Sequence, residues 1–329
     1  MVFIVLFLKK AIESTLKKTN VRPLTLAALL VLVIASVSMF YVFIGPEFEI
    51  SITQSWGRVA HDTTEINTVI AVNNPTPLSR WLKKIEFSLY INDLKIASEV
   101  SEKSIEVKPL GKTEISLTSF LNNSKIPDLW TTYLEKDDFN VTMAGNVTFG
   151  SRMREIVCPI DYKNRVHTPL LELLNIRQPR DLRAGPTTLT LKSLNLTWGE
   201  VTSVQTKINS NAVICNPNNY PITIKKINYT IEMNGIKMGE GEAKYNSTVL
   251  EAKTDNNVWF MAIMNNTMLD DWWATHLKND QVTKVAVKLR GVAEVSGTDY
   301  DFIIAEVGVE ASIRILSGTI SYGFYLPIL

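Results

Sequence analysis

The sequence predicts an all-β fold, in which two tandem β-sandwiches with one short helix each follow a single transmembrane helix. Three observations predict it: an apolar run of 21 residues, a pattern that repeats after 142 residues, and a period-two alternation of apolar residues in each copy. The composition, 46% apolar with a formal net charge of +1, excludes a disordered chain and gives no sign of nucleic-acid binding. Two cysteines exclude a disulfide-stapled scaffold.

The apolar run, Leu24 to Ile44, contains no charged residue, proline or glycine. As a helix it would be about 31 Å long, which matches a hydrocarbon core of about 30 Å. It is too long for a cleaved signal peptide, although Ser36-Val37-Ser38 could imitate a cleavage site. Basic residues precede it, so residues 1–23 are predicted to be a cytoplasmic tail, and everything after the run is predicted to lie outside the cell membrane. These basic residues are Lys9, Lys10, Lys17, Lys18 and Arg22. Val2 to Leu8 is too short to cross, and an interfacial segment and a frayed tail both stay open.

The repeat aligns Trp56-Gly57 with Trp198-Gly199 and Asn74-Pro75 with Asn216-Pro217, and a one-residue slip aligns Trp130 with Trp273. After three more residues of slip, Gly145 meets Gly291. The predicted domains are therefore residues 47–158 and 187–315. Between them, residues 159–186 hold four prolines and are predicted to form a linker with one helical turn near Leu170 to Ile176. Residues 316–329 are taken as an apolar C-terminal tail.

Within each copy, apolar and polar residues alternate over residues 85–92 and 227–234, which predicts strands with one buried face. Asn92-Asp93 and Asn234-Gly235 then predict tight hairpin turns. The strands before Asn74-Pro75 and Asn216-Pro217 must end there or lie at an edge, because proline cannot donate to a ladder. Each copy also contains one segment that is not predicted to be a strand. It is an amphipathic helix, near residues 127–137 in the first copy and 268–280 in the second, and its apolar stripe is expected to lie on the sandwich. Strands over residues 141–149 and 285–295 follow.

The strand ending at Asn216-Pro217, the later Pro221, the Asn234-Gly235 hairpin and the Trp-bearing helix resemble the group-2 late embryogenesis abundant family. This family is also called the water stress and hypersensitive response (WHy) domain. The second copy fits better, since the second proline of the first copy comes early, at Pro77, and predicts a different loop. The resemblance implies fibronectin- or immunoglobulin-like sandwiches, no enzymatic activity and a role in desiccation or stress tolerance. Relatives carry such domains behind an N-terminal transmembrane helix, archaeal relatives carry tandem copies, and some eukaryotic relatives have been proposed to handle lipid.

Enzymatic chemistry is not expected. The three histidines, His61, His167 and His276, have no carboxylate or nucleophile that recurs beside them in both copies, and there is no phosphate loop or metal-ligand cluster. No catalytic residue, cofactor or metal is therefore predicted, and His276 is interpreted as a half-buried packing residue. A disulfide between Cys158 and Cys215 is a minor alternative to two buried thiols.

The leading hypothesis is a single-pass membrane protein that serves stress protection or envelope scaffolding. One alternative is a lipid-handling module with a groove between helix and sheet, and the other is an adhesive or fibre subunit with an exposed edge strand. Trp130, Trp272 and Trp273 are predicted core residues, or a surface for lipid or a partner in the alternative. The expected partners are the membrane and either lipid or envelope proteins, with no nucleic acid. Seven sequons are predicted glycosylation sites, with unmodified asparagines as the alternative: Asn122, Asn140, Asn146, Asn195, Asn228, Asn246 and Asn265.

Overall fold

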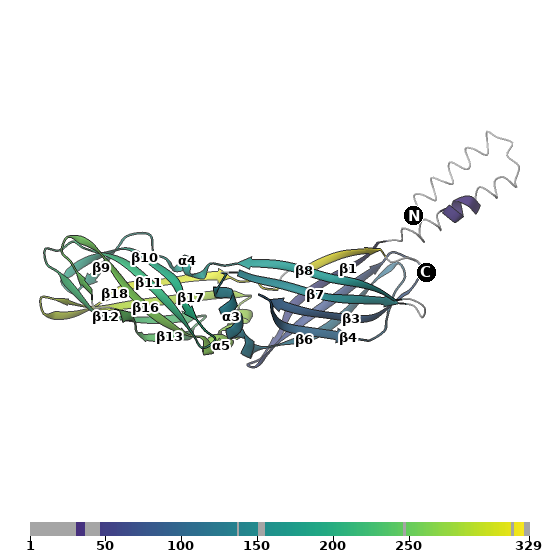
Figure 1. Ribbon diagram of the computed structural model, residues 1–329, viewed down its shortest axis with the longest axis horizontal. Coiled ribbons are helices and arrows are strands. Elements are labelled where there is room, and N and C mark those ends of the chain that lie inside the picture. The colour runs from purple at the N-terminus through teal and green to yellow at the C-terminus, as the bar shows by residue number, and fades with distance from the viewer. Residues whose placement is uncertain are drawn as a thin grey trace, which may run out of the picture.

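The chain is all-β, as predicted, and forms two sandwiches that lie end to end (Figure 1). The computed structural model describes residues 31–36, 47–136, 138–150, 155–245, 248–316 and 319–325. Most of the predicted anchor, Leu24 to Ile44, lies outside these residues, and the described part, residues 31–36, is helical. In the described part of the chain no helix is both long and apolar enough to span a membrane.

The first half contains eight strands and one helix that follows a single 3-10 turn. They are β1 (Glu47–Val59), β2 (Thr63–Asn74), β3 (Arg80–Ile91), β4 (Leu94–Ser101), β5 (Ile105–Val107), β6 (Gly111–Asn122), η1 (Asn123–Lys125), α3 (Ile126–Leu134), β7 (Asp138–Gly150) and β8 (Glu155–His167).

The second half repeats this order after a short connection. Its elements are α4 (Leu170–Leu174), β9 (Arg180–Ala184), β10 (Thr187–Val201), β11 (Gln205–Asn216), β12 (Ile222–Met233), β13 (Ile236–Glu242), β14 (Lys244–Tyr245), β15 (Thr248–Leu250), β16 (Thr254–Asn265), η2 (Asn266–Met268), α5 (Leu269–Lys278), β17 (Val282–Val295), β18 (Thr298–Ser312) and β19 (Thr319–Tyr325).

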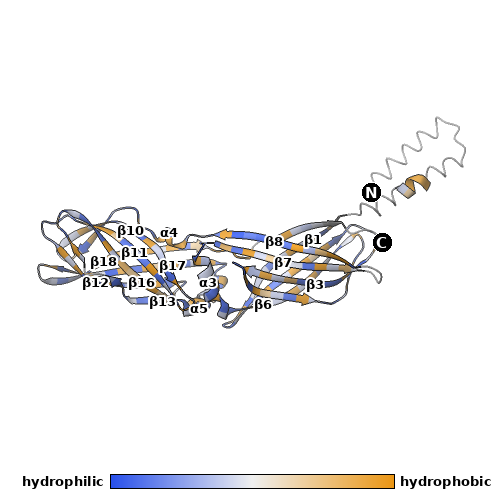
Figure 2. Ribbon diagram, in the orientation of Figure 1, coloured by the Kyte–Doolittle hydropathy of each residue, from blue (hydrophilic) through white to orange (hydrophobic). Residues whose placement is uncertain are grey.

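Each sandwich packs two antiparallel sheets. In the first, the sheet β19-β1-β2-β6 faces β4-β3-β7-β8, with β5 also paired to β3. In the second, β14-β16-β11-β10-β9 faces β13-β12-β17-β18, with β15 also paired to β12. The predicted alternation is present in β3 and β12, where Ile85, Phe87, Leu89, Ile227 and Ile231 are buried between polar neighbours. Figure 2 shows hydrophobic and hydrophilic stretches along the strands of both sandwiches. Burial of one face of each sheet forms the core.

The predicted hairpins are confirmed. Asn92 and Asp93 have φ values of 47° and 68°, and Asn234 and Gly235 have 51° and 81°, which are the two consecutive positive φ angles of a two-residue turn. The asparagine of each turn also accepts a hydrogen bond from the strand beyond it, since Asn140 N donates to Asn92 Oδ1 at 2.8 Å. The turn is thereby fixed to β7 as well as to its own hairpin.

The loops after the Asn-Pro pairs share one framework. Buried Asn74 donates to the Leu78 carbonyl at 2.8 Å, and buried Asn216 donates to the Tyr220 carbonyl at 2.9 Å. The first copy was expected to have a different loop, but the hydrogen bond from the buried asparagine is the same in both copies. The two loops differ in their solvent-facing residues.

Two predicted boundaries need correction. β8 continues past Cys158 to His167, so the first nine residues of the predicted linker belong to the first sandwich. Pro159 is tolerated because β8 is an outer strand, where a missing N–H on the free side costs no ladder bond. The helical turn of the linker is α4.

The predicted C-terminal tail, residues 316–329, is the second correction. Thr319–Tyr325 is strand β19, which returns to the first sandwich and pairs with Glu47 to Thr53 of β1. β9 occupies the corresponding place beside β10 in the second sandwich. The strand that follows each copy's last long strand therefore covers the first strand of the other copy.

Candidate functional site

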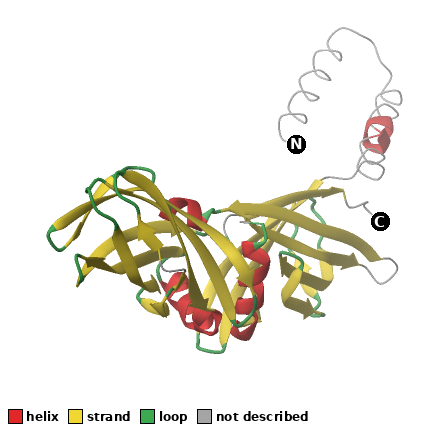
Figure 3. Cartoon of the chain, turned by 60° about the vertical axis from the view of Figure 1, so that its left-hand side comes forward, coloured by secondary structure: helices red, strands yellow, loops and turns green. Residues whose placement is uncertain are grey.

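The helices lie together between the sandwiches, and each packs on the other copy as well as on its own sandwich, where it was expected (Figure 3). Trp130 of α3 packs edge-on against Trp198 of β10, with ring centroids 6.0 Å apart. Trp273 of α5 packs in the same way against Trp56 of β1, at 5.3 Å. Each helix thus places its tryptophan on a strand tryptophan of the other copy. Trp272 contacts Trp130 at 5.7 Å and completes what we term the aromatic junction.

A hydrogen bond from Trp273 of the second copy to Thr64 of the first copy crosses the aromatic junction. Trp273 Nε1 donates to Thr64 Oγ1 at 3.2 Å, and that hydroxyl donates to Asn123 Oδ1 at 2.8 Å. Asn123 is buried and also donates to the carbonyls of Ala60 and His61. In contrast, Trp130 Nε1 is buried without a partner.

The sequence reading missed Asn123 and its counterpart Asn266. Asn266 makes similar contacts: Thr206 Oγ1 lies 3.1 Å from its Oδ1, and its Nδ2 donates to the Thr202 carbonyl at 2.6 Å. The signal that would have revealed them is the triplet Asn-Asn-Ser/Thr, which occurs at Asn122 and again at Asn265. The first asparagine of each triplet caps the following 3-10 turn, so two predicted sequons coincide with structural caps.

His276 and Tyr133 occupy corresponding positions on α5 and α3, and both bind the chain where it leaves its sandwich. The Tyr133 hydroxyl donates to the Thr168 carbonyl, and His276 Nε2 lies 3.2 Å from the Ile313 carbonyl. His276 is fully buried, not half-buried, and stacks on Trp272 at 5.2 Å. Burial lowers the pKa of His276 to about 4, against the opposing effect of hydrogen bonds to backbone groups.

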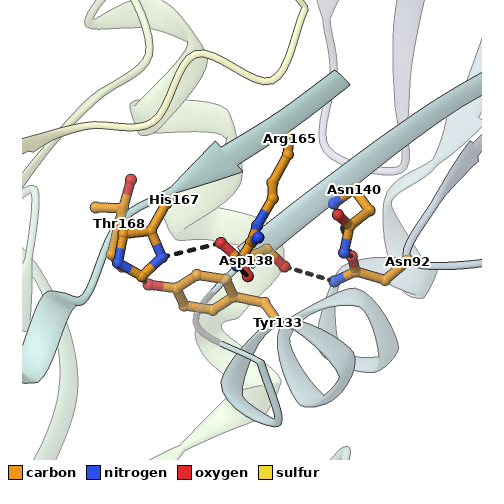
Figure 4. Close-up of polar contacts among 7 residues, drawn as sticks. All are labelled: Asn92, Tyr133, Asp138, Asn140, Arg165, His167 and Thr168. Atoms are coloured by element: carbon orange, nitrogen blue, oxygen red, sulfur yellow. Dashed lines mark hydrogen bonds and ion pairs between the residues drawn. The ribbon is translucent and has the colours of Figure 1, made fainter. Parts of the chain in front are cut away.

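A polar cluster surrounds Asp138 at the start of β7 (Figure 4). Arg165 Nη2 lies 2.5 Å from one carboxylate oxygen, and His167 Nδ1 lies 2.9 Å from the other. The Arg165 hydrogen bond is the main reason that the pKa of Asp138 is lowered, and burial opposes it. The Asp138 carbonyl also accepts from Asn92 Nδ2 at 2.9 Å. The cluster therefore ties the end of β8 to β7 and the hairpin turn, close to the crossing point near Thr168.

An apolar cavity of about 40 Å³ lies inside the second sandwich, at the end that meets the aromatic junction. Trp130 and the α4 residues Leu170, Leu171 and Leu174 form part of its wall. The other lining side chains come from the facing sheets and are nearly all apolar: Leu196, Trp198, Ile208, Ser210, Tyr229, Ile231, Met233, Ala262, Met264, Val285, Val287 and Leu289. An apolar cavity of about 150 Å³ is needed to hold benzene, so an acyl chain would require α4 or Trp130 to move.

The tryptophans predicted as core, or alternatively as a surface, lie in the interior. Trp130, Trp272 and Trp273 are each 2% exposed. Trp130 forms part of the wall of the apolar cavity in the second sandwich.

Among the predicted glycosylation sites, three asparagines are exposed: Asn122, Asn195 and Asn265. Three others are partly buried, namely Asn140, Asn146 and Asn228, and Asn246 lies outside the described residues. Glycosylation of these sites stays a prediction.

The disulfide alternative is wrong, because Cys158 and Cys215 are both free. Cys158 lies on β8 opposite Val147, and Cys215 lies on β11 between Thr190 and Asp255. They belong to different sandwiches. Burial raises the pKa of Cys158 to about 11, which keeps its thiol protonated and unreactive.

The polar groups that could support catalysis are few among the described residues and can be considered one by one. They contain no group of three or more His, Cys, Asp and Glu side chains placed to hold a metal. His276 and Thr283 form a hydroxyl–imidazole pair at 2.9 Å, but both are fully buried and out of reach of a substrate. His167 is accessible, and its hydrogen-bond partner is Asp138, which is also held by Arg165. These polar groups serve the packing between strands, helices and crossing segments.

The family model described as "Late embryogenesis abundant protein" matches residues 69–164, from β2 to β8. The matched residues lie within the first sandwich. No curated protein sequence matches the chain.

Among solved structures, a crystal structure of a protein from Archaeoglobus fulgidus is 29% identical, with a TM-score of 0.36, over 38% of this chain and 99% of its own. The solution structure of a protein from Arabidopsis thaliana is 19% identical, with a TM-score of 0.32, over 37% of this chain and 83% of its own. Another solution structure, described as a late embryogenesis abundant protein, is 15% identical, with a TM-score of 0.29, over 44% of this chain and 85% of its own.

Proposed function

We propose that the chain is a non-enzymatic, membrane-anchored stress protein that presents two WHy-type sandwiches as one rigid unit outside the cell. The observation that carries the proposal is the family match over residues 69–164. The aromatic junction supports the rigid unit, since buried tryptophans and the Trp273–Thr64 hydrogen bond join the copies. Such a unit would act as a spacer and scaffold at the membrane surface during water loss.

The direct test is drying. The full chain is reconstituted in phosphatidylcholine vesicles that hold a trapped dye, and the vesicles are dried and rehydrated. We expect the chain to reduce dye leakage relative to vesicles without protein. A matched control is Trp273→Ala, which loosens the aromatic junction and should protect less. Equal leakage with and without the chain would reject a protective role.

Anchoring and orientation have their own test. Protease added to intact cells should remove both sandwiches and leave residues 1 to about 44 protected. Replacing Lys17, Lys18 and Arg22 with Glu should weaken this orientation, because the basic flank is its main determinant. Sandwiches that resist protease in intact cells would contradict the extracytoplasmic location.

Lipid handling is the second candidate function, and it requires that α4 or Trp130 move to widen the apolar cavity. Its walls are apolar, and the unpartnered Nε1 of buried Trp130 belongs to one of the lining side chains. Mass spectrometry of the intact chain from native membranes would reveal a carried lipid. Ala262→Leu fills the cavity from within and should abolish that lipid, whereas Ala97→Leu in the first sandwich should not. The adhesive or fibre alternative stays a prediction without a specific observation in its favour.

A further inference from the structure

The two copies differ in the loops farthest from the aromatic junction. β1 runs from Glu47 toward the junction, and β2 returns, so the loops after β2 and before β6 lie at the end where β1 begins. These loops are joined, because Leu110 N donates to the Thr76 carbonyl at 2.8 Å. Three large apolar side chains are exposed there: Leu78 at 48%, Trp81 at 46% and Leu110 at 71%. We term these three residues the basal tip.

The second copy provides the comparison within the same chain. β3 and β12 begin at Arg80 and Ile222, and β6 and β16 begin at Gly111 and Thr254. The counterparts of Leu78, Trp81 and Leu110 are therefore Tyr220, Thr223 and Lys253. They lie at the opposite end of the molecule, because the two junction ends meet in the middle (Figure 1). That far end exposes Tyr220 at 39%, whose ring carries a polar hydroxyl, and one aliphatic side chain, Val249 at 46%, where the first copy has Glu106.

Leu110 is also held in an unfavourable backbone conformation. Its φ is 47°, and its counterpart Lys253 has a φ of 60°, so the turn itself needs the left-handed region. A glycine or asparagine would adopt that region at lower cost than leucine. The first copy thus presents a large apolar side chain to solvent at a position where neither the turn nor the core requires it.

The distance to the predicted membrane anchor is short. Gly45 and Pro46 alone separate Ile44 from Glu47, the first residue of β1. Three residues of fully extended chain span at most about 11 Å, and the headgroup layer on each side of the hydrocarbon is about 5 to 8 Å thick. Loops at the start of β1 are therefore held within reach of the headgroup layer if residues 24–44 span the bilayer, and whether they enter it depends on their own side chains.

We propose that the basal tip inserts into the headgroup layer of the bilayer that holds the chain's own anchor, and so fixes the molecule relative to the membrane; this rests on the anchor proposed above. Tryptophan and leucine are favoured in that layer, where an apolar body and a polar edge are both satisfied. Charges of both signs lie beside the tip, with Arg80, Lys103 and Lys108 against Glu102 and Glu106. The three side chains that define the tip are themselves apolar, so the inferred contact is tested with lipid that carries no net charge.

The test uses the full chain, with Cys158 and Cys215 replaced by alanine, in vesicles of zwitterionic phosphatidylcholine that carry a headgroup-level nitroxide quencher. A fluorophore is attached at Ser79→Cys beside the basal tip or, as a control, at Asn219→Cys at the far end. We expect the quencher to reduce the fluorescence of the label at position 79 about twofold or more and to leave that at position 219 unchanged. The double variant Trp81→Thr with Leu110→Lys places in the first copy the residues that the second copy has at the corresponding positions, Thr223 and Lys253. It should abolish the quenching at position 79 without unfolding the chain. Thr223→Trp with Lys253→Leu at the far end should leave it unchanged.

The possible failures can be separated. If the chain floats with the vesicles but position 79 is not quenched, the anchor stands and the basal tip does not insert. If energy transfer between labelled chains at position 79 replaces lipid quenching, a second copy covers the tip and the inference is wrong. If the chain does not float with vesicles at all, the proposed anchor fails, and the inference fails with it.

Discussion

Replacing His276 by tyrosine should remove a pH-dependent part of the stability. The neutral imidazole is satisfied on both sides: Thr283 Oγ1 lies 2.9 Å from Nδ1, and Nε2 lies 3.2 Å from the Ile313 carbonyl. Trp272 Nε1 already donates to Thr283 Oγ1, so the hydroxyl proton is directed toward the imidazole. A proton added at Nδ1 would face that hydroxyl proton, in a site closed to water.

The magnitude follows from the pKa. It is about 4 in the folded chain and 6.5 for an ordinary histidine. The unfolded chain therefore takes up a proton at a pH where the folded chain does not, so stability is full above about 6.5 and falls as pH drops toward about 4. At 1.36 kcal/mol per pKa unit, the loss between pH 7 and pH 4.5 is about 2 kcal/mol.

The assay is urea unfolding of the full chain in detergent, followed by tryptophan emission from pH 4.5 to 7.5. His276→Tyr should lose about 2 kcal/mol less than the native chain on acidification, because tyrosine does not titrate there and should reach the Ile313 carbonyl as Tyr133 reaches that of Thr168. His276→Phe serves as the control, and acidification should reduce its free energy of unfolding as little as that of His276→Tyr. At every pH it should be less stable than His276→Tyr by about 1 to 3 kcal/mol, because the Ile313 carbonyl loses its hydrogen-bond partner. An unchanged pH dependence in both variants would refute the reasoning.

Three further outcomes are expected. Trp273→Ala should lower the free energy of unfolding by about 3 to 5 kcal/mol in urea titrations, and by more than Trp272→Ala, because the hydrogen bond that it removes, to Thr64, joins the two copies, whereas the bond of Trp272 to Thr283 lies within the second copy; a loss under about 1 kcal/mol would contradict this. Removal of residues 317–329 should lower the melting temperature and cause concentration-dependent association in light scattering, because Glu47 to Thr53 lose their strand partner; an unchanged monomer would argue that β19 is dispensable. Asp138→Asn should lower the melting temperature at neutral pH but not at acid pH. A carboxyl with a lowered pKa stabilises the fold above its ordinary pKa of about 4 and loses that effect as pH falls. If the melting temperatures of the variant and the native chain differ by the same amount at every pH, the Asp138 charge is not involved.

The local structure could be predicted from the sequence because it depends on neighbouring residues. Alternation along β3 and β12 set the buried face, and the dipeptides at Asn92 and Asn234 set the turns. The helices followed from apolar spacing for the same reason. These signals act within about ten residues, so they survive without knowledge of the tertiary fold.

The placement of the helices and of β19 could not be predicted in this way. An apolar stripe must be buried, but nothing in its spacing says which sandwich buries it, and Trp130 and Trp273 each cover the other copy. β19 pairs with β1 from the other end of the chain, so no local pattern identifies its partner. Without that partner, a short apolar segment is readily interpreted as a tail.

Matching residue types can also mislead about register. The sequence aligns Gly145 with Gly291, but Gly145 lies opposite Phe87, and Gly291 lies opposite Ile227, the counterpart of Ile85. The two glycines answer different needs. A Cβ at Gly145 would clash with the Glu86 carbonyl oxygen, whereas one at Gly291 would clash with the Phe302 ring.

The exchange of covering elements has a consequence for folding. The second sandwich is closed at the junction by Trp130 and α4, which come from the first copy and the connection, and the first sandwich gains β19 and a contact from Trp273 of the second. Either sandwich alone would expose tryptophan and leave a long strand edge unpaired, at a cost comparable to the few kcal/mol by which domains are stable. The two sandwiches should therefore unfold in one transition, with a urea dependence set by the surface of both, and the aromatic junction is what prevents them from behaving as independent domains.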